Sequence, residues 1–185
     1  MFSPETTKPL CDLVQALLTG RHSLTPAERE IIATQVSSQN DCIYCQSCHG
    51  STAAQHLGGS DADYELIASI KQNYEATAIS SKMKALLAIA GKVQKGGTYV
   101  TGDDVARAGR EGATYKEIHD AVLIAAAFCR HNRYVDGLAT WAPSDPDMYR
   151  ENGRRLADEG YVQSAAHLRP SSDRPIGGEK PTPQY

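Results

Sequence analysis

The stretch Asp41-Cys42-Ile43-Tyr44-Cys45-Gln46-Ser47-Cys48-His49 gathers most of the reactive side chains of this protein. It holds three of the five cysteines and one of the six histidines. The sequence on either side of it predicts helices and short links. The function therefore depends mainly on the chemistry that this stretch supports.

A helix over this stretch would place two thiols and the imidazole on one face. Residues advance by about 100° each along a helix, so Cys42, Cys45 and His49 fall within roughly 60° of one another. Cys48 would lie roughly 100–120° from Cys42 and from His49, turned aside from them. Asp41 is a good N-cap candidate, which would put Cys42 in the first turn, where the helix dipole favours a thiolate. His49, one turn beyond Cys45, is placed to exchange a proton with that sulfur.

Three kinds of site can be built from these residues. A dithiol redox centre would use Cys42 and Cys45 together with His49. A covalent haem would use Cys45, Cys48 and His49, which match the C-x-x-C-H attachment string. A metal or cluster site would use all three cysteines and the histidine.

The sequence favours the dithiol centre over its alternatives. Covalent haem attachment usually requires export, yet residues 1–8 lack the basic and apolar segments of an export signal. Haem would also leave Cys42 without a role. We find no second Cys/His pair with zinc spacing, and we expect neither a bound cofactor nor a metal. The remaining alternative is a helix with buried, inert cysteines.

Composition limits the classes of partner. With 41% hydrophobic and 22% charged residues, the sequence is ordinary for a globular protein. The net charge of −3 and the pI of about 6.1 give no electrostatic case for nucleic acid or an anionic membrane. No apolar run approaches the ~18 residues of a membrane span. The odd number of cysteines is typical of a cytoplasmic redox protein, with Cys11 and Cys129 as buried apolar fillers.

We expect one domain over residues 1–168 and a tail over residues 169–185. The tail contains several prolines and a Gly-Gly pair, and has too few apolar residues for a core of its own.

The apolar spacing predicts an all-α fold, because it shows no clear strand pattern. Capping boxes or similar helix starts occur at Thr25, Ser60, Thr101 and Thr114. The helix that begins at Thr114 is apolar nearly all round, so we expect it to be the buried centre. The predicted helices cover residues 8–19, 25–37, 41–57, 60–74, 81–93, 101–112, 114–133 and 146–158.

Glu30 lies on the helix before the cysteine stretch. The capping box that begins at Thr25 needs Glu28 but not Glu30. The short link over residues 38–40 would let the two helices pack as neighbours. Glu30 could then orient His49 or accept its proton. It could equally be a solvated surface carboxylate, and spacing alone does not separate the two interpretations.

Glu30, the stretch Ser37-Ser38-Gln39-Asn40-Asp41-Cys42-Ile43-Tyr44-Cys45, and His49 together resemble a known signature, Glu…Ser-x-x-Asn-x-Cys-x-Tyr-Cys-x-x-x-His. It belongs to the carboxymuconolactone decarboxylase superfamily, in its alkylhydroperoxidase D-like, peroxidase-related branch. The resemblance covers roughly residues 8–140. Matches to the second half of that branch are Asp103-Asp104-Val105, Gly112, Phe128 and Asn132-Arg133-Tyr134.

The resemblance implies an all-α fold, homotrimers or homohexamers, and a thiol-dependent peroxidase. In such a protein Cys45 would attack the hydroperoxide and Cys42 would close the disulfide. His49 and Glu30 would relay protons, and a dithiol protein or small thiol would reduce the disulfide. Decarboxylation is not expected, because the decarboxylases of the superfamily lack the cysteine pair. Cys48 departs from the signature, and a non-catalytic redox-sensing scaffold remains an alternative.

Overall fold

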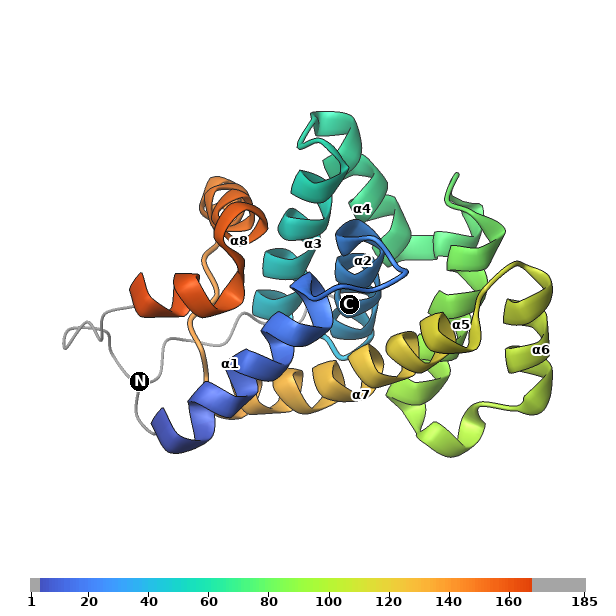
Figure 1. Ribbon diagram of the computed structural model, residues 1–185. Coiled ribbons are helices and arrows are strands. Elements are labelled where there is room, and N and C mark those ends of the chain that lie inside the picture. The colour runs from blue at the N-terminus through green and yellow to red at the C-terminus, as the bar shows by residue number, and fades with distance from the viewer. Residues whose placement is uncertain (1–3, 168–185) are drawn as a thin grey trace.

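The computed structural model describes residues 4–167, and every regular element in that range is a helix (Figure 1). The predicted all-α fold is confirmed. None of the described helices combines the length and the apolar character needed to cross a membrane. The predicted tail over residues 169–185 lies outside the described residues, so the domain division stays a prediction. The helices are α1 (Pro4–Thr19), α2 (Pro26–Gln39), α3 (Ile43–Leu57), α4 (Asp61–Asn73), α5 (Ser81–Lys95), α6 (Gly102–Arg110), α7 (Tyr115–Gly137) and α8 (Pro146–His167), with short 3-10 turns at Tyr74–Ala76 and Gly97–Tyr99.

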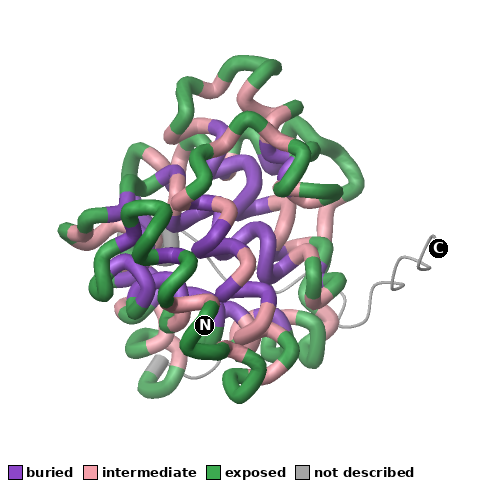
Figure 2. Tube along the Cα trace, turned by 90° about the vertical axis from the view of Figure 1, so that its right-hand side faces the viewer, coloured by how far each residue is buried: buried purple, intermediate pink, exposed green. Residues whose placement is uncertain are grey.

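Helix α2 is the centre of the fold. It packs against α1, α3, α4, α5 and α7, and ten of its fourteen residues are buried. The buried segments gather in the interior of the molecule (Figure 2). The prediction that α7 is the buried centre is wrong: Ile124 and Phe128 are buried, but Leu123 is 38% exposed. Helix α7 lies at the edge of the bundle, so its outer side faces solvent (Figure 1).

Four helices begin with the local motifs that the sequence predicts. At Thr25, Ser60, Thr101 and Thr114 the cap hydroxyl accepts a bond from the backbone N–H three residues on. In each, the acidic side chain at that third position accepts the N–H of the cap residue. Loss of such a cap costs about 1 kcal/mol. These motifs fix where the helices begin without any help from distant residues.

The link between α2 and α3 differs from the prediction. Asp41 does not cap α3; it adopts a left-handed conformation with φ 55°, and Cys42 is the N-cap residue without a side-chain capping bond. The turn is held from α7, because Asn132 donates to Ser37 Oγ (2.9 Å) and accepts from Asn40 (2.8 Å). The Cys42 N–H also donates to the Ser37 carbonyl at 3.0 Å. These hydrogen bonds hold the link in this turn, and Cys42, at the end of the link, is fully buried.

Helix α8 continues past the residue where the sequence predicts its end. Gly160 interrupts the helix with φ 75° and ψ −176°, and a second segment then runs to His167. The break frees two N–H groups, and Gln15 Oε1 of α1 accepts both, from Tyr161 at 2.6 Å and from Val162 at 3.2 Å. This contact ties the second segment of α8 to α1 and brings Tyr161 toward α2 and α3.

Candidate functional site

The four residues predicted to form the site lie on two adjacent helices. Cys42 precedes α3, Cys45 lies in its first turn, His49 lies one turn later, and Glu30 lies on α2. Their relative exposures are 0% for Cys42, 4% for Cys45, 8% for His49 and 0% for Glu30. The interpretation of Glu30 as a solvated surface carboxylate is therefore wrong.

The Glu30 carboxylate is held between an imidazole and a phenol. His49 Nδ1 lies 2.9 Å from Glu30 Oε2, and the Tyr161 hydroxyl donates to Glu30 Oε1 at 2.6 Å. The Tyr161 oxygen is also 3.0 Å from His49 Nδ1, and the two rings stack with centroids 5.7 Å apart. Burial, followed by the charge of Glu30, raises the pKa of Tyr161 well above its usual value. Tyr161 is therefore a protonated donor, and Glu30 has a polar neighbour at each oxygen.

This arrangement determines which imidazole nitrogen is free. A proton on Nδ1 points at the carboxylate, so the lone pair of a neutral His49 is on Nε2. The edge-to-face contact with Phe128, whose ring centroid is 4.5 Å away, fixes the plane of the imidazole. A buried carboxylate is costly without such partners. Glu30 and Tyr161 thus set both the tautomer and the orientation of His49.

The two signature cysteines are not equivalent. A hydrogen bond with Cys45, and secondly burial, raise the pKa of the Cys42 thiol, so that Cys42 stays protonated. Cys45 shares a cavity with His49, but no direct hydrogen bond joins the two in the described part of the chain. A proton would have to pass between them through a molecule in the cavity.

Cys48 is not turned aside as predicted, because it lines the same cavity as Cys45 and His49. It lies three residues beyond Cys45, about 60° away around the helix. Burial raises the pKa of Cys48 to about 12, and the Asn152 amide lies 3.6 Å from its sulfur. Cys48 therefore remains a neutral thiol. All five cysteines are free in this structure.

The cavity beside Cys45 has a volume of about 210 Å³ and lies between α1, α3, α7 and α8. Burial, followed by the charge of Arg130, lowers the pKa of His131 to about 4, so this second histidine is neutral near pH 7. Cys11 also lines the cavity and is half-buried, so the prediction that it is a buried apolar filler is wrong. Cys129 is half-buried and packs against the hydrophobic core. Most of the wall is apolar, with contributions from Val14, Phe128, Val135 and Leu156.

Comparison with known proteins agrees with the fold. Residues 4–90 match the model of the Carboxymuconolactone decarboxylase family. An uncharacterized peroxidase-related protein from Silicibacter sp. TM1040 shares 25% identity at a TM-score of 0.71, over 81% of this chain and 75% of that one. The alkylhydroperoxidase AhpD core of an uncharacterized peroxidase-related protein from Ralstonia eutropha JMP134 shares 25% identity at a TM-score of 0.72, over 82% and 76%. The predicted resemblance is confirmed: this is a carboxymuconolactone decarboxylase/alkylhydroperoxidase D-like fold. No curated protein matches the chain.

Within this alkylhydroperoxidase D-like fold, Tyr161 is the site residue that the sequence does not reveal. It lies 112 residues from His49 and follows the glycine at which α8 was expected to end. The one local signal is an aromatic residue directly after that glycine. Nothing in the spacing indicates that its hydroxyl would reach Glu30.

Proposed function

We propose that this protein is a thiol-dependent peroxidase that reduces organic hydroperoxides with the Cys42–Cys45 pair. The observation that carries the proposal is the fully buried Glu30, bonded to a histidine that shares a cavity with Cys45. Both solved structures described above bear the name peroxidase-related, which supports the same class of activity.

In the first step Cys45 attacks the terminal oxygen of the hydroperoxide and the O–O bond breaks. Cys45 becomes a sulfenic acid, and the organic part leaves as an alcohol. The thiol proton passes to the leaving oxygen by way of His49 Nε2, while Nδ1 stays bonded to Glu30. Proton transfer of this kind is worth about 10²–10⁴-fold in rate. No atom is gained or lost, since thiol and hydroperoxide give sulfenic acid and alcohol.

In the second step the Cys42 sulfur attacks the Cys45 sulfenic acid. The S–OH bond breaks, a disulfide forms, and the hydroxyl leaves as water with the Cys42 proton. The raised pKa of Cys42 suits this order, because a protonated thiol does not compete for the peroxide. A dithiol protein or small thiol then restores both thiols by exchange and is itself oxidised. We further propose that the active form is a homotrimer or homohexamer.

The cavity suits an organic hydroperoxide better than hydrogen peroxide. Its volume of about 210 Å³ leaves room for a small organic group, and apolar side chains supply most of the wall. Burying a hydrocarbon group contributes about 0.8 kcal/mol per CH₂. We therefore expect cumene hydroperoxide to react faster than hydrogen peroxide.

The proposal is tested by stopped-flow oxidation of the reduced protein, followed by mass mapping. Cys45→Ser should abolish peroxide consumption, whereas Cys42→Ser should leave a Cys45 sulfenic acid that a dimedone-type probe can trap. Cys48→Ser is the matched control and should keep both the rate and the Cys42–Cys45 disulfide. Peroxide consumption that survives in Cys45→Ser, or a probe attached to Cys42 or Cys48, would contradict the assignment. A visible haem spectrum would instead favour a covalent haem on Cys45 and Cys48.

A further inference from the structure

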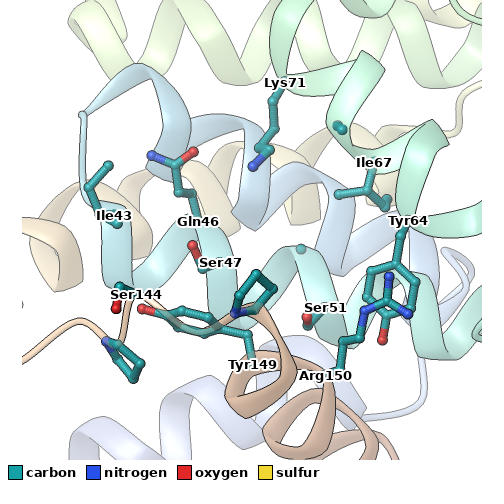
Figure 3. A pocket seen from close by; sticks show the side chains of 14 residues that line it. Ile43, Gln46, Ser47, Ser51, Tyr64, Ile67, Lys71, Ser144, Tyr149 and Arg150 are labelled. Atoms are coloured by element: carbon teal, nitrogen blue, oxygen red, sulfur yellow. The ribbon is translucent and has the colours of Figure 1, made fainter. Parts of the chain in front are cut away.

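A second hollow lies on the opposite side of α3 from the redox cavity. It has a volume of about 410 Å³, and α3, α4 and the beginning of α8 form its walls (Figure 3). Ile43, Gln46 and Ser47 of α3 line it, whereas Cys45 and His49 line the other cavity. Nothing in the proposed peroxidase chemistry uses this hollow, although its volume falls in the range of small-molecule sites.

Lys71 of α4 brings an unbalanced positive charge to this hollow. Its side chain points toward the space above Gln46 and Ser47 (Figure 3). No hydrogen bond or ion pair joins Lys71 to another residue in the described part of the chain. Burial lowers the pKa of Lys71. A partly buried ammonium without a counter-ion is unfavourable, and a bound anion would remove that cost.

The other cation of the hollow is already neutralised. Arg150 donates to Asp61 at 3.0 Å and lies over the Tyr64 ring, 4.1 Å from its centroid. No aspartate or glutamate lines the hollow. The site therefore carries one unbalanced charge, which matches a monoanion better than a phosphate dianion.

Tyr149 of α8 also lines the hollow. The Tyr149 hydroxyl is buried and lies beside the Ser47 side chain. Burial is the largest cause that raises the pKa of Tyr149 to about 12, so the hydroxyl is a neutral donor. The walls between these polar groups are largely apolar, with Ile43, Ile67, Pro143 and Pro146.

We propose that this hollow binds a small organic monocarboxylate, with the carboxylate at Lys71 and the hydrocarbon body against the apolar walls. The inference is independent of the proposed peroxidase function, because it uses none of the redox residues.

Isothermal titration of the full-length reduced protein with octanoate tests the proposal. Octanamide has the same chain without the charge, and inorganic phosphate is an anion without the chain. Lys71→Met removes the charge and keeps the length of the side chain. Lys95→Met is the matched control, because Lys95 is exposed at the end of α5. We expect saturable binding of octanoate that is about fivefold weaker in Lys71→Met, the loss that corresponds to removal of one solvent-accessible ion pair. Binding should be unchanged in Lys95→Met.

Thermal unfolding gives an independent readout that also shows whether the variant folds. Octanoate should raise the Tm of the wild type more than the Tm of Lys71→Met. Equal binding of octanoate and octanamide would overturn the proposal, since the hollow would then be an apolar groove without anion selectivity. Tighter binding of phosphate, equal affinity in Lys71→Met, or absence of saturable octanoate binding would each overturn it as well.

Discussion

Tyr161→Phe is the substitution that most directly tests how the buried carboxylate is held. It removes one hydroxyl group and keeps the ring that stacks on His49 with a centroid separation of 5.7 Å. Glu30 Oε1 then loses its donor at 2.6 Å, while the contact of Oε2 with His49 at 2.9 Å stays in place. The variant therefore separates the support of Glu30 from the Glu30–His49 contact itself.

The expected magnitude follows from the burial of this bond. A hydrogen bond to a charged group is worth about 1.5–3 kcal/mol, and removal of the donor leaves the acceptor without a partner. Glu30 is 0% exposed, so water cannot readily replace the hydroxyl. We expect the free energy of unfolding to fall by about 2 kcal/mol, near the middle of that range. Cys45 oxidation should slow by about tenfold, less than the 10²–10⁴-fold that full loss of acid–base help would cause.

Urea unfolding and stopped-flow oxidation measure the two effects on the same preparation. Tyr115→Phe is the control: Tyr115 is 86% exposed, so its hydroxyl has no buried partner to lose. It should change neither quantity. If Tyr161→Phe unfolds and reacts like the wild type, Tyr161 does not support Glu30. A loss of stability at an unchanged rate would restrict Tyr161 to the fold and remove it from the proton relay.

Two further predictions concern the histidines around the cavity. Glu30→Gln and His49→Gln should each slow Cys45 oxidation by about 10²-fold or more. The double variant should react little more slowly than the slower single variant, because the two residues act as a unit. If the two losses multiply in stopped-flow measurements, the residues act independently. The pKa of His131 in the folded protein is about 4, below the ordinary value of 6.5. As the pH falls, the unfolded chain therefore binds this proton before the folded protein does. The free energy of unfolding should then decrease as the pH drops from 6.5 toward 4. In urea titrations at pH 7 and pH 5, His131→Gln should reduce this pH dependence of the free energy of unfolding. The control His119→Gln, at an exposed position, should not reduce it. The same pH dependence in both variants would contradict the role given to His131.

Sequence reasoning succeeded where the physical cause is local. The helix starts at Thr25, Ser60, Thr101 and Thr114 depend on residues three positions apart, so the sequence shows both partners of each capping box. The short link between α2 and α3 predicts that the two helices are adjacent, and hence that Glu30 can lie near His49.

The sequence does not predict features that depend on packing between residues far apart in the chain. The burial of Glu30 could not be decided from spacing, because it results from several helices closing around α2. The apolar composition of α7 predicts too deep a position for the same reason, since it does not show which side of the helix lacks a neighbour. The residue type of Asp41 predicts a helix cap, yet the hydrogen bonds of Asn132 with Ser37 and Asn40 impose a different turn. Tyr161 required both the break at Gly160 and the contact with Gln15, which no local pattern contains.

The proton relay and the packing of α8 depend on each other. A fully buried carboxylate is tolerated only when its partners are in place, and one of those partners, Tyr161, comes from α8. The first segment of α8 can approach α3 closely because residue 153 is glycine: a Cβ atom there would lie 2.7 Å from Ser51. Gly160 then redirects the chain so that Tyr161 reaches Glu30. Gly153 and Gly160 carry no reactive group, yet they let α8 bring Tyr161 to the Glu30 carboxylate. They thereby help to fix the His49 tautomer that the proposed chemistry at Cys45 requires.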